Sequence, residues 1–178
     1  DAPQARAVAM AMPPDATPAA RARLAALAGD LDGVGALQPQ LTTSGELLQL
    51  IEPLVEVGAL TRARALWVQA RPSVTAAEVS RWVYATILLA AVDRAHQREI
   101  EPAMLTVLRA GDGGPWLALL ARFVAGDVPY AEAFAASADR GQRAEVLFYE
   151  ALLAHGRGEP AVAEQLLTAV VAGGPPTF

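Results

Sequence analysis

Few side chains in this sequence are of the types that perform catalysis or hold a metal. The chain has no cysteine and two histidines, His96 and His155. Neither histidine stands at a useful spacing from a second potential ligand or catalytic partner. His155 falls near the end of a predicted helix, where a ring that can carry positive charge stabilises free carbonyl groups. We therefore predict no catalytic residue, no metal and no cofactor, and we expect that this protein is not an enzyme.

Two further stretches look functional but have plainer explanations. Residues 111–114 (GDGG) superficially resemble a phosphate-binding loop. They lack a preceding strand and a following Lys-Ser/Thr, so we interpret them as a turn. Glu52 and Glu56 are spaced i, i+4 on one predicted helix. A solvated helix face is one interpretation of this pair, and contact with an Arg, a Lys or an amide of a partner is the other.

The composition indicates a folded, apolar protein. Of its 178 residues, 53% are hydrophobic and 19% are charged, which predicts a sizeable core. All 14 basic residues are arginine, they form no cluster, and the net charge of −5 argues against nucleic-acid binding. The longest uncharged apolar run, residues 82–92, is too short to span a bilayer, so we predict no transmembrane segment. The absence of cysteine fits both the cytoplasm and the bacterial envelope, of which we favour the envelope.

Helical periodicity follows an Ala/Pro-rich start. Residues 1–16 are expected to be an arm or linker, and residues 17–178 a single domain. Apolar residues recur at i, i+3, i+4, i+7 and i+8, as on one face of an amphipathic helix. Capping patterns such as Thr43-x-x-Glu46 mark helix starts, and Pro53 should kink or split its helix. The predicted helices cover 17–28, 31–38, 43–57, 59–71, 75–95, 99–110, 115–125, 128–138, 141–157 and 160–172.

Short glycine-containing turns between these helices predict antiparallel hairpins. Gly158 can take the left-handed conformation that ends one helix, and Pro160 is tolerated in the first turn of the next. Equivalent glycines are Gly58 and Gly126, at intervals of 68 (126 − 58) and 32 (158 − 126) residues. The spacing predicts a repeat of about 34 residues, about five hairpins, and a missing turn near residue 92. Stacked neighbours would bury the apolar stripes of each hairpin.

This pattern resembles the tetratricopeptide repeat and its Sel1-like relatives. In that family a Gly-Asp or Gly-Asn pair marks the turn, Ala recurs early in the second helix, and a larger apolar residue leads on to Pro. The similarity covers roughly residues 43–175 and is strongest in the last two units. The matching positions are Gly58, Ala63, Trp67 and Ala70, then Gly126, Asp127, Ala131 and Ala135, then Ala151, Gly158, Ala163, Leu167 and Pro175.

The resemblance implies an all-α, right-handed α-solenoid of stacked antiparallel hairpins, whose first helices line a concave groove. Aromatic residues recur with the same spacing, at Trp82, Trp116 and Phe148, and would form an apolar ladder in this groove for a partner protein or an extended peptide. Packing of these residues between adjacent hairpins is the alternative, and it is the role we expect for Trp67. The predicted partner-binding residues are Glu52, Glu56, Trp82, Trp116, Leu120, Phe148, Leu152 and His155.

We therefore expect a non-catalytic protein–protein interaction scaffold, with the assembly of a bacterial envelope complex as one setting. Two alternatives stay open: a regulatory or sensor repeat domain of a larger multidomain protein, and a polymer-binding module of polysaccharide machinery. The predicted helix 160–172 is apolar on more than one side, and no capping helix follows it. We expect this C-terminal edge to be covered by further repeats, by a second copy of the chain, or by the N-terminal arm of a neighbour.

Overall fold

The structure, a computed structural model, describes residues 15–173, and every regular element in that range is helical. The predicted all-α class is therefore confirmed. The chain divides into two compact units, residues 1–85 and 86–178, and the boundary falls inside helix α7 (Val79–Ala95). The single domain over 17–178 and its solenoid arrangement stay predictions, and the predicted arm lies almost wholly outside the described residues.

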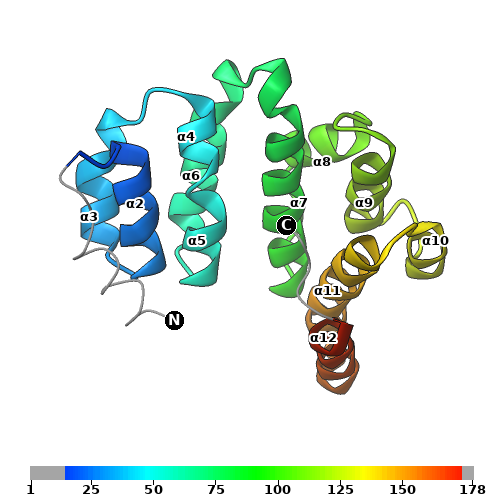
Figure 1. Cartoon of the computed structure of the whole chain (residues 1–178). Helices are drawn as coiled ribbons and strands as arrows, with labels where there is room; N and C mark the ends of the chain where they lie inside the picture. The colour runs from blue at the N-terminus through cyan, green and yellow to red at the C-terminus, as the bar shows by residue number, and fades with distance from the viewer. Residues whose placement is uncertain (1–14, 174–178) are drawn as a thin grey trace. The chain divides into compact units, whose positions relative to one another are not determined.

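The first unit is built from short helices joined by tight turns (Figure 1). Helix α2 packs against α3, and α6 packs against both α4 and α5. Two of the predicted hairpins are thus present in this unit. Its helices are α2 (Pro18–Leu27), α3 (Leu31–Leu37), α4 (Ser44–Leu48), α5 (Ile51–Glu56) and α6 (Leu60–Ala70), with 3-10 turns at Gln38–Gln40, Arg71–Ser73 and Ala76–Glu78.

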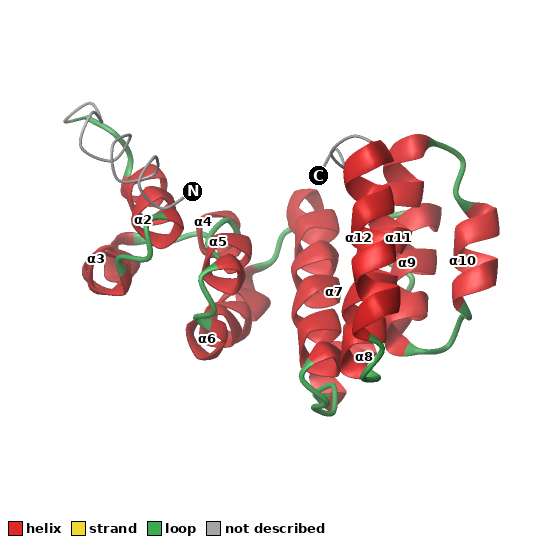
Figure 2. Cartoon of the chain, turned by 90° about the horizontal axis from the view of Figure 1, so that it is seen from below, coloured by secondary structure: helices red, strands yellow, loops and turns green. Residues whose placement is uncertain are grey.

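The second unit contains the longer C-terminal helices. Helix α8 packs on α9, α10 contacts α9 and α11, and α12 packs on α11 (Figure 2). The α11–α12 pair is the antiparallel hairpin that the Gly158–Pro160 turn predicts. The helices are α8 (Pro102–Arg109), α9 (Pro115–Ala125), α10 (Tyr130–Ala136), α11 (Arg140–Gly156) and α12 (Pro160–Gly173).

The predicted capping patterns begin their helices as expected. The Thr43 hydroxyl accepts a hydrogen bond from the Glu46 backbone N–H, and the Glu46 carboxylate accepts one from the Thr43 N–H. Thr75 and Glu78 form the same reciprocal pair. At α11, the Asp139 carboxylate accepts from the Gln142 N–H at 2.9 Å. These bonds satisfy backbone donors that a helix start otherwise leaves free.

Five helices end in one shared backbone motif. In each, a residue with positive φ follows the helix, and the next N–H bonds the carbonyl five residues earlier, as Glu159 does to Ala154 at 3.0 Å. This is the Schellman arrangement, which satisfies free carbonyls at a helix end. The positive-φ residues are Gly29 (73°), Gly58 (75°), Gln97 (57°), Gly126 (90°) and Gly158 (79°).

These turns correct the predicted period. No turn occurs near residue 92, because α7 continues to Ala95 and Gln97 takes the left-handed position instead. A residue other than glycine is uncommon there, so the sequence does not signal this turn. Consecutive turns are 29, 39, 29 and 32 residues apart, from Gly29 to Gly158. Each hairpin therefore contains the same type of turn, but the interval between turns is not a constant 34 residues.

Pro53 splits its predicted helix, as expected. Helix α4 ends at Leu48, α5 begins at Ile51, and turn residues Gln49 and Leu50 separate them. Proline has no N–H to bond the carbonyl four residues earlier, which here belongs to Gln49, and its ring crowds that carbonyl. The break therefore falls one helical turn before the proline.

The described core is formed mainly by Ala, Leu and Val, as the composition predicts. In the first unit, Trp67 and Trp82 stack with their rings 4.5 Å apart and nearly parallel. Trp67 is therefore a core residue, as expected. In the second unit, Ala151 and Ala154 of α11 pack against Ala163 of α12. Small side chains at these positions let the two helix backbones approach closely.

Candidate functional site

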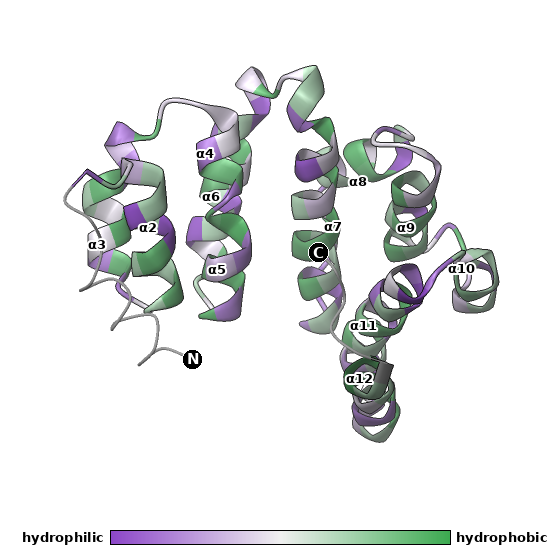
Figure 3. Cartoon of the chain, viewed as in Figure 1, coloured by the Kyte–Doolittle hydropathy of each residue, from purple (hydrophilic) through white to green (hydrophobic). Residues whose placement is uncertain are grey.

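Helix α12 carries the most exposed large apolar side chain of the described residues. Val171 is 79% exposed, and Leu167 and Val162 are 42% and 43% exposed. Glu164 is the only charged residue between Pro160 and Gly173, and hydrophobic colours dominate this helix in Figure 3. Leu167 and Val171 lie one helical turn apart on one side of α12, and exposed apolar side chains grouped in this way mark interaction sites. We therefore treat α12 and the end of α11 beside it as the candidate site.

Two rows of side chains run along α12. The inner row faces α11 and contains the buried Ala163 and Val170 with the half-buried Leu166 between them. Each inner-row residue is followed directly by a residue that is exposed. We call these three exposed residues the outer row, and we add to it the exposed residue four positions before the first of them. The outer row consists of Pro160, Glu164, Leu167 and Val171, and all four are exposed.

A shallow depression lies beside the outer row. It is open to solvent, and apolar atoms dominate its surface. His155 is the lining residue that α11 contributes, and the other lining residues belong to α12. The depression can receive an apolar side chain or a helix ridge, and one imidazole and one carboxylate lie at hand for polar contacts. Its lining residues are His155, Pro160, Ala163, Glu164, Leu167, Thr168, Val171 and Ala172.

A close backbone approach holds the end of α11, and with it the hairpin turn, in place. A Cβ atom added at Gly156 would lie 2.2 Å from the Arg94 carbonyl oxygen and 2.9 Å from the Ala95 Cα, both in α7. The Arg94 guanidinium in turn donates to the Val124 carbonyl of α9 at 2.8 Å. The ends of α7, α9 and α11 thus meet at one joint, from which the α12 hairpin extends.

An arginine in the turn ties α11 to the start of α12. Arg157 Nη2 lies 2.7 Å from a Glu150 carboxylate oxygen and 2.9 Å from one of Glu159. Hydrogen bonds to Glu159 and then Glu150 raise the pKa of Arg157 above its ordinary value. Glu150 is nearly buried, so this cation supplies the partner that a buried carboxylate needs. Arg157, Glu150 and Glu159 thus pair with one another inside the hairpin and hold its turn in place.

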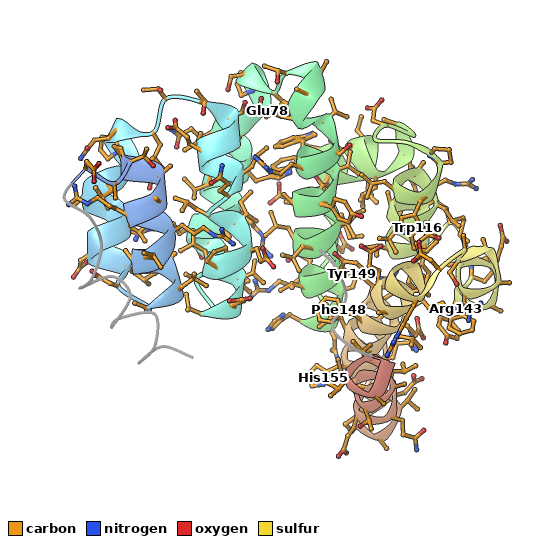
Figure 4. The ribbon with its side chains drawn as sticks, viewed as in Figure 1. Glu78, Trp116, Arg143, Phe148, Tyr149 and His155 are labelled. Carbon is orange, nitrogen blue, oxygen red and sulfur yellow. The ribbon has the colours of Figure 1, made fainter. Side chains whose placement is uncertain are left out.

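Trp116 is anchored from α9 onto α11. Its indole N–H donates to Glu145 at 2.6 Å, and Glu145 is a buried carboxylate. The indole is half-buried. Figure 4 labels Trp116 on α9, and Phe148 and His155, which follow one another along α11. A tryptophan held by a hydrogen bond to a buried carboxylate has a structural role in the second unit.

The structure separates the predicted partner-binding residues into two groups. Leu120 is fully buried among the core residues of α9, and Trp82 is 7% exposed and stacks on Trp67, so neither presents a surface to a partner. Their placement in the ladder is corrected, because both side chains lie on the buried, core-facing stripe of their helices. Trp116 is half-buried, so part of its side chain also packs inside the second unit.

The remaining predicted residues are at least partly accessible. Glu52 and Glu56 are exposed on α5 of the first unit. In α11, Phe148 and Leu152 are half-buried and His155 is exposed. His155 alone belongs to the depression beside α12. The sequence predicts Leu167 only as a repeat position and helix 160–172 only as an apolar edge to be covered, because apolar spacing does not distinguish the inner row from the outer row.

Residues 15–173 contain no cluster of three or more His, Cys, Asp or Glu side chains that could hold a metal ion. In the same range, no helix combines the length and the apolar character needed to cross a membrane. Comparisons with protein-family models, with curated proteins and with solved structures found no significant match.

Proposed function

We propose that this protein is a non-catalytic interaction module that binds a protein partner through the outer row of α12. The observation that carries the proposal is the exposure of Leu167 and Val171 on a helix with a single charged residue. Full burial of an aliphatic side chain of this size contributes about 1.5–3 kcal/mol. Leu167 and Val171 are 42% and 79% exposed, so covering them gains part of this free energy at Leu167 and most of it at Val171.

The surface favours a helix as the bound element. The outer-row positions are spaced by four, three and four residues, which is the spacing of a helix-pairing seam. A helix laid along α12 would place its own apolar row on Leu167 and Val171 and would fill the open depression beside them. An extended peptide would bury less of this row, because its side chains alternate between two faces.

The finer architecture belongs to the same proposal. A right-handed α-solenoid of five hairpins would present such a surface at its C-terminal edge, where a further helical pair stacks in a longer array. The shared turn motif at five helix ends supports this architecture. A second partner site along α11 is consistent with Phe148, Leu152 and His155, which follow one another at intervals of four and three residues.

The proposal is tested by affinity capture with matched baits. Wild-type protein, Leu167→Glu and Val162→Glu are immobilised and exposed to an extract of cells that contain the natural partner, and bound proteins are quantified by mass spectrometry. Leu167 and Val162 are equally exposed but lie on different sides of α12. We expect proteins that bind wild type and Val162→Glu but not Leu167→Glu. An identical set of bound proteins on all three baits would refute a partner site on the outer row.

A further inference from the structure

We propose that the partner of the outer row is the outer row of a second copy of this chain, paired antiparallel about a twofold axis. This inference rests on the proposed function, because it names the occupant of the same face. It makes the protein a homodimer that forms a small four-helix contact from two α11–α12 hairpins. Three features of the described residues point to this occupant: the symmetry of the row, its charge and its dimensions.

The row is symmetric under reversal. Its positions are 160, 164, 167 and 171, so the intervals of four, three and four residues read the same in both directions. A twofold axis through the midpoint between Glu164 and Leu167 therefore superimposes the row on itself. Each Val171 would pack on the other copy's Pro160, and each Leu167 on the other copy's Glu164. This reversible spacing meets one requirement of an isologous interface, in which the same surface of each copy pairs with itself.

The pairing also leaves the carboxylate of Glu164, the one charged residue of the row, in contact with water. The aliphatic part of Glu164 would cover the Leu167 of the other copy, while its carboxylate stays at the rim in water. Glu164 is exposed, so its carboxylate can remain hydrated in the pair. By the same symmetry the two Glu164 residues lie about 4.5 Å apart along the helix axis, three residues at 1.5 Å each. Their carboxylates must therefore turn outward to the rim, where solvent weakens the repulsion between them.

The charge of the surface favours a second acidic copy over a strongly charged partner. The chain carries a net charge of −5, yet α12 contributes one carboxylate over its whole length. Two negatively charged molecules approach with the least repulsion across their least charged face. A site for a basic partner would need several carboxylates around the row, and the helix has only Glu164.

The dimensions set the expected strength. Helix α12 has 14 residues, so it is about 21 Å long at 1.5 Å per residue. One helix row covers less than the roughly 800 Å² per partner of a standard interface. We therefore expect a weak, reversible dimer with a dissociation constant on the order of 10–100 μM.

The first test is sedimentation velocity on the purified full chain from about 1 to 300 μM, a range that brackets the expected constant. We expect monomer at the low end and dimer at the high end for wild type and Val162→Glu, and monomer throughout for Leu167→Glu. Circular dichroism must show the same helix content in all three proteins. A wild type that stays monomeric, or a dimer that Leu167→Glu leaves intact, would overturn the proposal, as would equal loss of the dimer in Val162→Glu.

The second test uses the absence of cysteine from the chain. In Leu167→Cys the new thiols of two antiparallel copies lie about 4.5 Å apart along the helix axis, three residues at 1.5 Å each. A short bismaleimide should therefore link Leu167→Cys into dimers and leave Val162→Cys, which is equally exposed, largely unlinked. Equal linking of both variants, or none of either, contradicts the antiparallel pair. Coverage of the row by another segment of the chain would also protect the thiol and refute it.

The two proposals fail in different ways. A purified chain that is monomeric in both tests, combined with captured proteins that Leu167→Glu loses, would refute the homodimer and keep the interaction function. A chain that neither self-associates nor captures proteins in a manner dependent on Leu167 would refute both.

Discussion

Replacing Gly156 by alanine tests the close approach that holds the α12 hairpin. Gly156 lies in the last turn of α11, where alanine is the better helix former by about 0.5–1 kcal/mol. The added Cβ, however, would lie 2.2 Å from the Arg94 carbonyl oxygen, well inside the 3.4 Å at which ordinary contact begins. The helix ends would have to separate by about 1 Å. Overpacking of this kind costs about 1–3 kcal/mol.

The obstacle is backbone rather than a mobile side chain, so the upper part of that range applies. The net expectation is a loss of about 1–2.5 kcal/mol in the free energy of unfolding, despite the gain in helix propensity. Chemical denaturation followed by circular dichroism measures it. Gly35→Ala in α3 is the control, because its added Cβ meets only the end of the Arg62 side chain at 3.5 Å. That variant should be as stable as wild type or more so. Equal or greater stability of Gly156→Ala would refute the close approach of α11 and α7.

Three further changes test other contacts. Trp116→Phe removes the indole N–H that donates to the buried Glu145, and denaturation should show a loss of about 1–3 kcal/mol. Ala151→Leu should cost about 1–3 kcal/mol in the same assay, because Ala151 packs against α12, and an unchanged stability would contradict this packing. Hydrogen bonds from Ser44 and Thr75 lower the pKa of Glu78 from 4.5 to about 2. The stabilisation by Glu78 should be full above pH 4.5 and disappear as the pH falls toward 2, so the difference in Tm between wild type and Glu78→Gln should shrink over that range.

Local structure was largely predictable because its causes are local. Capping side chains such as Thr43 bond backbone groups three residues away, and Gly158 ends α11 through its own conformation. The same reasoning located the break caused by Pro53. It failed at Gln97, because a left-handed residue other than glycine leaves no sign in the sequence. The predicted interval between turns is therefore more regular than the observed one, because the turn at Gln97 is predicted near residue 92.

Contacts between helices were the part that the sequence could not supply. Gly156 stands two residues before the turn glycine, and nothing in the sequence indicates that a side chain is excluded at this position of the helix. Only the packing of α11 on α7 shows that a side chain is excluded there. The same holds for Leu120 and Trp82, which were placed in a groove. Periodicity assigns apolar residues to a helix face, but the neighbours of that face decide whether it is core or surface.

Helix α12 illustrates this limit and also why its outer row needs a functional explanation. The inner and outer rows have comparable apolar spacing, and the close packing of Ala163 on Ala151 and Ala154 decides which one faces α11. A helix can turn only one row toward a single neighbour. For folding alone, a polar side chain would serve as well at Val171, which is 79% exposed, and Leu167 leaves 42% of its side chain uncovered. Scattered exposed apolar residues are ordinary, but a spaced row beside an apolar depression is the kind of surface that a second helix covers.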